Sequence, residues 1–249
     1  MGDLAGKTAL VTGGGRGGGA AIARALAGGG ARVLVSYVRS GEAARKLAEE
    51  IDGVAVAGDV ATPESCASLA RAAETALGGL DVLVNNASYA SKASWNRPLE
   101  ALDPAEFDRV VLVDLRGTFL MSRACIAMLR ARRGCIVNVA SSAALQGDAE
   151  TLVHNAAKMG VVGFTRSLAR AEARSGVRVN AVAPGSIDTG WIESWRLDEA
   201  DRRALVEAIP LGRVARAEEL GEAVAFLCSP RASYVTGQTL VVDGGVLMR

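Results

Sequence analysis

The chain has 249 residues, half of them hydrophobic and only 4% aromatic, and its 28 Lys and Arg residues nearly balance its 27 Asp and Glu residues. That length fits one large α/β domain or two small ones, and an aliphatic core suits a parallel sheet covered by helices. The balanced charge excludes any strong attraction to nucleic acid or to an anionic membrane, so we expect a small-molecule substrate and, as the other partner, further copies of the chain.

Strand and helix signals alternate from the first residues to the last. Glycine pairs or triplets end two of the expected helices, and Pro63 begins one. We expect strands at 8–12, 32–36, 54–56, 80–84, 135–139, 178–182 and 239–242, and helices at 20–27, 42–51, 63–77, 104–132 and 151–174.

This alternation predicts an α/β fold: a Rossmann-like, doubly wound, seven-stranded parallel sheet in a single domain over residues 1–249. Ligands of such sheets bind at the carboxyl ends of the strands, near the switch point of the strand order. Residues 185–210 form the longest stretch without an expected strand. We expect this stretch to be either a mobile substrate lid or a helix packed permanently on the domain.

Neither the cysteines nor the apolar segments indicate a secreted or membrane protein. The four cysteines form no C-x-x-C pair and no metal-ligand spacing, which favours free thiols in a reducing cytosol and no metal site. The N-terminus lacks the pattern of a signal peptide or of a myristoylation site, and no apolar run is long enough to span a bilayer. We therefore expect a soluble cytoplasmic protein.

A glycine cluster, T-G-G-G-R-G-G-G over residues 12–19, lies between the first strand and the first helix. Glycines permit a tight turn and let backbone N–H groups approach a pyrophosphate, which the helix N-terminus also attracts. The cluster predicts a dinucleotide site, the alternative being a merely flexible loop. The residues expected to contact the cofactor here are Gly13, Gly15, Arg16, Gly17 and Gly19.

The choice of cofactor is predicted from charge. NAD enzymes with this kind of sheet usually carry an acid at the end of the second strand, for the ribose hydroxyls. The stretch 36–40 holds no acid here, whereas Arg39 and Ser40 suit a 2′-phosphate that Arg16 would approach from the other side. The sequence therefore favours NADP(H) over NAD(H), unless both arginines are simply solvated surface charges.

Six motifs in order along the whole chain resemble those of the short-chain dehydrogenase/reductase family, and in particular bacterial 3-oxoacyl-thioester reductases and their relatives in secondary metabolism. The motifs are the glycine cluster, Gly58-Asp59-Val60, Asn85-Asn86-Ala87-Ser88, the pair Ser141 and Lys158, Pro184-Gly185-Ser186-Ile187-Asp188-Thr189, and Asp243-Gly244-Gly245. The resemblance implies that Asp59 and Val60 contact adenine, that the loop of Asn85 and Ala87 flanks the nicotinamide, and that Pro184, Gly185, Ile187 and Thr189 form the turn at its carboxamide.

The resemblance also implies a catalytic set of Asn, Ser, Tyr and Lys, from which this chain departs twice. Lys158, which would hold the nicotinamide ribose, and Ser141, which would polarise the substrate carbonyl, are present. The tyrosine position, one helical turn before the lysine, holds His154, and the asparagine position holds Asp114. The fourth residue of the family's N-N-A-G motif is Ser88 instead of Gly. Two changes among proton-handling residues indicate altered chemistry or lost activity.

His154 is the only histidine in the chain, and a lone histidine is more often structural than catalytic. Its position in the cofactor cleft nevertheless favours a role in acid–base chemistry. Imidazole is about one to two ångströms shorter than a phenol, so two routes are open for proton transfer by His154: directly to the substrate, or through a bridging water. Lys158 would lower its pKa and Asp114 would raise it, which leaves the net direction open. Tyr89 is a possible substitute acid, although a wall of the substrate pocket is the more natural role.

Three functions are compatible with these residues. The first is an NADP(H)-dependent oxidoreductase acting on a carbonyl or hydroxyl substrate. The second is a non-redox cyclase, isomerase or dehydratase that uses His154 and Asp114 as acid and base, and the third is a catalytically silent NADP-binding subunit. Aromatic side chains weakly suggest an aromatic or polyketide-like substrate, and long aliphatic helices suggest a homotetramer. The expected pocket residues are Tyr89, Trp191 and Trp195, with Trp95 nearby.

Overall fold

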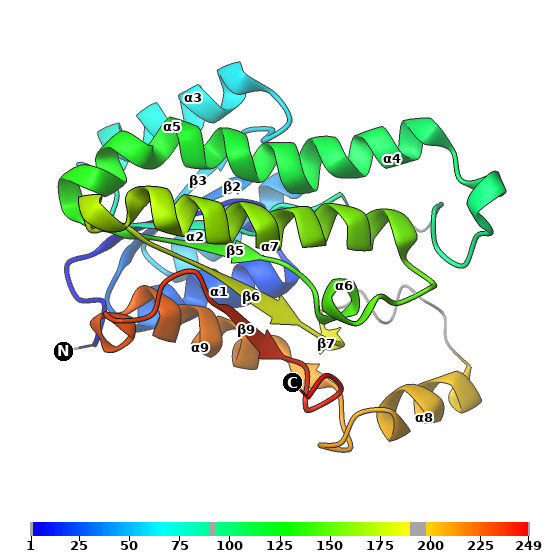
Figure 1. Ribbon diagram of the computed structural model, residues 1–249. Helices are drawn as coiled ribbons and strands as arrows, with labels where there is room; N and C mark the ends of the chain where they lie inside the picture. The colour runs from blue at the N-terminus through cyan, green and yellow to red at the C-terminus, as the bar shows by residue number, and fades with distance from the viewer. Residues whose placement is uncertain (1, 90–92, 190–197, 249) are drawn as a thin grey trace.

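The computed structural model describes residues 2–89, 93–189 and 198–248, and within them seven parallel strands form one sheet (Figure 1). The strand order is β3-β2-β1-β4-β5-β6-β9. Successive strands are added toward one edge of the sheet from β1 to β3 and toward the other edge from β4 onward, so the strand order switches between β1 and β4. This confirms the predicted Rossmann-like, doubly wound fold, with its switch point beside the glycine cluster. The strands are β1 (Thr8–Val11), β2 (Arg32–Tyr37), β3 (Val54–Ala57), β4 (Val82–Asn85), β5 (Cys135–Val139), β6 (Arg178–Pro184) and β9 (Thr239–Val242).

Helices cover both faces of the sheet (Figure 1). One core cluster joins the sheet to α1, α2 and α9, and a second joins it to α3, α5 and α7. Short 3₁₀ turns occupy Leu99–Ala101, Ala173–Ser175 and Pro230–Ala232. The helices are α1 (Gly17–Gly28), α2 (Gly41–Glu50), α3 (Pro63–Leu77), α4 (Pro104–Val110), α5 (Gly117–Arg132), α6 (Ser142–Gln146), α7 (Leu152–Glu172), α8 (Glu199–Glu207) and α9 (Ala217–Cys228).

The aliphatic character of the strands follows from burial on both faces. In β1, Ala9 and Val11 pack in the cluster beneath α1 and α9, whereas Leu10 packs in the cluster beneath α3 and α5. All three side chains are fully buried. A strand between two helical layers needs apolar residues at every position, which is why these strands read as continuous runs instead of alternating ones.

The long helical segment expected over 104–132 is interrupted by a π-helix. After α4, residues Val111–Arg116 form a wider turn before α5 begins. Aliphatic periodicity continues through all three parts, so the sequence pattern does not reveal the change. The wide turn carries Asp114, whose side chain is buried, and such turns are frequent at functional sites.

The expectation that residues 185–210 contain no strand was wrong. The strand β7 (Ile187–Asp188) pairs in parallel with β8 (Ala215–Arg216), and α8 lies farther along the segment. A two-residue strand is stabilised by its distant partner and leaves no local pattern. Residues 190–197 lie outside the described part of the chain, and the lid remains a prediction.

In the described residues, no helix has both the length and the apolar character needed to cross a membrane. The four cysteines are free and buried, and burial raises the pKa of the Cys66 thiol to about 11 and that of Cys125 to about 12. The same part of the chain holds no group of three or more metal-ligating side chains.

Candidate functional site

Two polar side chains form hydrogen bonds between the glycine cluster and the end of β4. The Asn86 amide donates hydrogen bonds to the carbonyl oxygens of Thr12 (3.0 Å) and Gly13 (3.2 Å). The Thr12 hydroxyl accepts from the backbone N–H groups of Asn86 and Ala87, both at 3.0 Å. No specific role for Thr12 or Asn86 was predicted from the sequence, because these bonds join residues more than seventy positions apart.

The glycines of this loop fit a dinucleotide. Gly13 and Gly17 have φ angles of +63° and +54°, which disfavour any residue with a side chain. A Cβ at Gly15 would lie 2.6 Å from the Ser40 hydroxyl, and one at Gly19 would collide with the Gly13 carbonyl. These glycine positions therefore carry no side chain at the start of α1, where a pyrophosphate needs to approach the backbone.

The adenosine end of the expected site is basic and free of acid at β2. Ser40 lies against the glycine loop through Gly15, while Arg16 and Arg39 are exposed and form no ion pair among the described residues. Asp59 is exposed and accepts the Ala61 N–H (2.9 Å). Val60 is buried, and a Cβ at Gly117 of α5 would lie 2.7 Å from its Cγ2.

The turn expected at the nicotinamide also meets the glycine loop. Thr189 lies beside Gly17, where an added Cβ would come 3.3 Å from the Thr189 Cβ. Pro184 ends β6, the Gly185 N–H donates to the Val242 carbonyl (3.0 Å), and Ile187 is buried in β7. The structure thus brings Thr189 to the start of α1.

Asn85 has a different place from its neighbours in the same motif. It is buried, and its amide donates to Asn138 (2.8 Å) and Ser122 (3.1 Å) in the interior. Its Oδ1 atom has no hydrogen-bond partner among the described residues. Because its side chain points into the interior, Asn85 would contact the cofactor through its main chain.

The expected catalytic lysine is buried in an ion pair. The Lys158 ammonium lies 3.1 Å from Asp114 Oδ2 and donates a hydrogen bond to the Val139 carbonyl (3.0 Å). The Lys158 side chain is 5% exposed and that of Asp114 is 0% exposed. Two charges taken out of water need good geometry and further hydrogen bonds to offset their desolvation, and this pair has both.

The Asp114 carboxylate is engaged on both oxygens. Oδ1 accepts the Tyr89 N–H (2.7 Å), and Oδ2 accepts the Ser88 hydroxyl (2.5 Å) in addition to Lys158. Thr118 donates its hydroxyl to the Asp114 main-chain carbonyl (2.7 Å). Asp114 was expected as an acid or base, and in the structure it is the partner of Lys158.

His154 lies one turn before Lys158 on α7 and is partly buried. Burial and the nearby Lys158 charge lower the pKa of its imidazole to about 4, against the opposing effects of Asp114 and Asp148. The direction of the His154 pKa shift, which the sequence left open, is therefore downward. At neutral pH the imidazole is uncharged and can donate or accept a hydrogen bond.

The structure describes some of the remaining expected site residues and not others. Ser141 is buried at the end of β5, where it precedes α6. Tyr89 packs against the apolar cluster formed by Val110, Val153 and Ala157. Trp191 and Trp195 lie outside the described residues, and the described Trp95 is partly buried.

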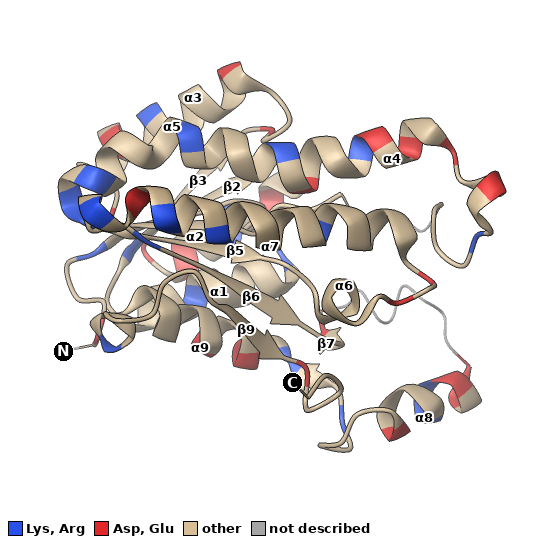
Figure 2. Ribbon diagram, viewed as in Figure 1, with Lys and Arg blue, Asp and Glu red and all other residues tan. Residues whose placement is uncertain are grey.

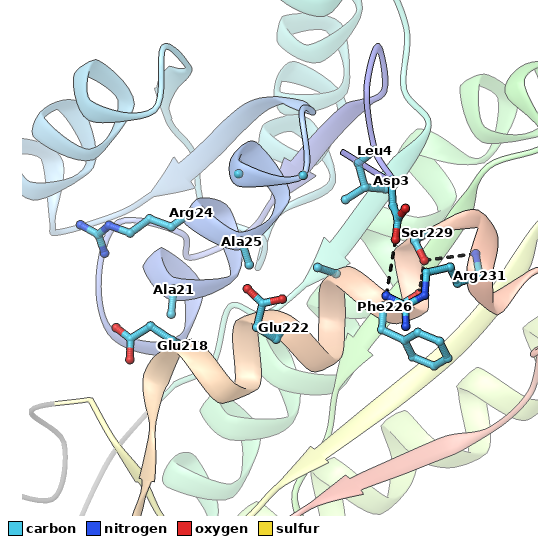
Figure 3. A pocket seen from close by; sticks show the side chains of 13 residues that line it. Asp3, Leu4, Ala21, Arg24, Ala25, Glu218, Glu222, Phe226, Ser229 and Arg231 are labelled. Atoms are coloured by element: carbon cyan, nitrogen blue, oxygen red, sulfur yellow. Dashed lines mark hydrogen bonds and ion pairs between the residues drawn. The ribbon is translucent and has the colours of Figure 1, made fainter. Parts of the chain in front are cut away.

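Two hollows of the molecule lie away from these residues. One, of about 460 Å³, lies between α1 and α9 and is lined by Arg24, Glu218, Glu222 and Arg231 among others (Figure 3). Another, of about 680 Å³, includes Lys7 and Cys135 at the amino ends of strands. Neither hollow is lined by Lys158 or by the glycine loop.

Comparison with known proteins finds relatives that match nearly the whole chain. A family model described as enoyl-(acyl carrier protein) reductase matches residues 13–247. The chain is 39% identical over 249 residues to a 3-oxoacyl-(acyl-carrier-protein) reductase of Vibrio cholerae, with 99% of each chain covered. It is 43% identical over 251 residues to the cis-4-hydroxycyclohexanecarboxylate dehydrogenase of Sinomonas cyclohexanicum, with 98% of each covered.

A solved structure resembles the fold equally well. The crystal structure of a short-chain alcohol dehydrogenase from Sinorhizobium meliloti superposes with a TM-score of 0.89 at 39% identity, covering 98% of this chain and 97% of the other. The fold of this chain agrees with that solved structure over nearly the whole length of both chains. The chain is an enzyme of the short-chain dehydrogenase/reductase family.

Proposed function

We propose that this chain is an NADP(H)-dependent ketoreductase or alcohol dehydrogenase of secondary metabolism, working in the cytoplasm. The family supports a nicotinamide-dependent redox reaction, and the relatives named above include a 3-oxoacyl reductase and an alcohol-oxidising dehydrogenase. The observation that carries the proposal is the buried Lys158, held beside His154 at the same edge of the sheet as the glycine loop.

Each residue has a distinct task in this proposal. The bound nicotinamide supplies or accepts the hydride. Lys158 uses two of its three donors on Asp114 and Val139 and offers the third to the nicotinamide ribose. Ser141 orients the oxygen of the substrate carbonyl.

His154 acts through water. An imidazole whose pKa is about 4 is not an effective cationic acid at neutral pH, and it is also shorter than a tyrosine. A neutral imidazole holds a water by a hydrogen bond instead. During reduction this water gives its proton to the substrate oxygen and is reprotonated from solvent.

The preference for NADP(H) rests on charge at β2. Arg39 and Arg16 are exposed and unpaired among the described residues, and Ser40 lies against the glycine loop. A guanidinium matches the geometry of a phosphate and has no equivalent partner on an unmodified ribose.

One observation favours a non-redox reaction as the second candidate. The depressed pKa leaves His154 unprotonated and able to remove a proton from a substrate. Asp114 is less suited to the second acid–base role, because both of its oxygens already accept hydrogen bonds. A silent NADP-binding subunit would use the same glycine loop without turnover.

The experiment is an NADPH oxidation assay with a panel of cyclic, aromatic and 3-oxoacyl-thioester ketones. Ketone-dependent loss of the nicotinamide absorbance supports the proposal. Conversion of a substrate without loss of that absorbance would establish the non-redox alternative. NADPH binding without any conversion across the panel would favour the silent subunit.

A further inference from the structure

Two departures from the family pattern contact each other. Ser88 stands where the family has glycine and Asp114 where it has asparagine, and the positions are 26 residues apart in the chain. The Ser88 hydroxyl donates a hydrogen bond of 2.5 Å to Asp114 Oδ2, the oxygen that also pairs with Lys158. The two changes therefore form one structural unit.

The contacts of this unit require a carboxylate. Three donors converge on the Asp114 side chain: the Tyr89 N–H on Oδ1, and the Ser88 hydroxyl and Lys158 ammonium on Oδ2. An asparagine would replace one oxygen by an NH₂ group, which would face a Tyr89 or Lys158 donor. The carboxylate, in turn, needs these donors because its side chain is fully buried.

We propose that Ser88 is a positioning residue that fixes the Asp114 carboxylate, and through it the Lys158 ammonium, for binding the nicotinamide ribose. Ser88 is itself exposed, so water can satisfy its hydroxyl group without the bond to Asp114. Its bond to a charged acceptor is short and directional, and it removes one direction in which the carboxylate and lysine can shift. This inference rests on the proposed use of a nicotinamide cofactor at this site.

The test is a double-mutant cycle of Ser88→Ala and Asp114→Asn, read by the Kd for NADPH in calorimetry and by the Tm of the cofactor-free protein. We expect Ser88→Ala to weaken NADPH binding about tenfold. Loss of a hydrogen bond to a charged group changes an equilibrium constant by about a factor of ten. In the Asp114→Asn background the same change should have less than about a twofold effect.

Three controls separate positioning from general structure. Ser88→Thr keeps the hydroxyl and should keep NADPH affinity, and Ser88→Gly should behave like Ser88→Ala. Ser233→Ala, at an exposed serine remote from the site, should leave the Kd unchanged. The KM for the ketone should change less than the Kd for NADPH, because the ribose and not the ketone contacts Lys158.

Equal NADPH affinity in Ser88→Ala and the unaltered protein would overturn the inference, as would additive effects in the cycle. A fall in Tm with no change in Kd would show that Ser88 only stabilises the fold. The cycle needs no ketone, so it remains readable if the proposed ketone reduction fails. Failure of the function and failure of the positioning role are thus distinguishable.

Discussion

His154 and Lys158 lie one helical turn apart, and the charge on the lysine helps to keep the histidine neutral. The sequence predicted their proximity, because four residues along a helix return the side chain to the same face. It did not predict that Asp114 pairs with Lys158. That contact joins residues 44 positions apart and depends on the wide turn of Val111–Arg116.

Because the chain has a single histidine, its ionisation can be observed without ambiguity. We predict that the imidazole NMR signals titrate in the folded protein with a midpoint near pH 4, since burial and Lys158 disfavour the cation. In urea-unfolded protein the midpoint should return to about 6.5. A folded-state midpoint at or above 6.5 would show that the imidazole is solvated or paired with a carboxylate.

The lowered pKa of His154 also predicts how stability depends on pH. Between about pH 6.5 and 4 the unfolded chain binds a proton at His154 that the folded chain does not, so the free energy of unfolding falls as the pH falls. We predict a loss of about 2 to 3 kcal/mol from this residue by pH 4.5. In His154→Gln, urea unfolding should show a correspondingly smaller loss, whereas identical pH profiles would argue against the burial of a neutral imidazole.

A phenol at position 154 should restore a direct proton donor beside Lys158. We predict that His154→Tyr raises turnover on simple ketones by at least about tenfold, because general acid catalysis contributes about a hundred- to ten-thousand-fold. His154→Phe is the matched control, since it supplies a similar ring without the hydroxyl and should not increase turnover. Equal rates for the two variants would mean that proton transfer is not limited at this position.

At the scale of elements, the sequence predicted the strands well and the irregular elements poorly. The strand at 135–139 is confirmed as β5, and β1 begins at Thr8 as expected, because aliphatic runs between glycines leave few other structures. The pair β7 and β8 and the π-helix were not predictable, since each is defined by contacts with distant segments.

The turn between β2 and α2 should decide cofactor preference. We predict that the protein binds NADP(H) more tightly than NAD(H), and that Arg39→Asp reverses or greatly narrows this difference by removing a phosphate partner and adding an acceptor for ribose hydroxyls. Arg71→Asp, an exposed charge change on α3, is the control and should not alter the ratio of the two Kd values. An unaltered protein that binds both cofactors equally would refute the assignment to Arg39.

At the scale of the whole molecule, α5 and α7 expose large apolar side chains on the surface of the helical layer. Phe119 of α5 and Met159 of α7 are 46% and 42% exposed, and the Phe119 ring meets Phe164 edge to face. Charged residues gather toward the ends of α5 and α7 (Figure 2). Exposed apolar surface of this kind commonly marks an interface.

We therefore predict a homotetramer in which α5 and α7 pair across a two-fold axis. Light scattering at micromolar concentration should give about four times the mass of one chain. Phe119→Glu combined with Met159→Lys should reduce that mass, while a charge change at the exposed Arg71 should not. A monomeric mass for the unaltered protein would falsify the tetramer.

Under the proposed function, this site reduces carbonyl groups with its nicotinamide cofactor despite His154 and Asp114. Mass spectrometry can follow deuterium from 4,4-dideuterated NADPH, which is labelled at both C4 positions, into the product of a ketone identified in the assay above. We expect one deuterium on the carbinol carbon of each alcohol molecule, formed at a rate that increases in His154→Tyr. A product formed without deuterium, or intact NADPH beside a converted substrate, would contradict it.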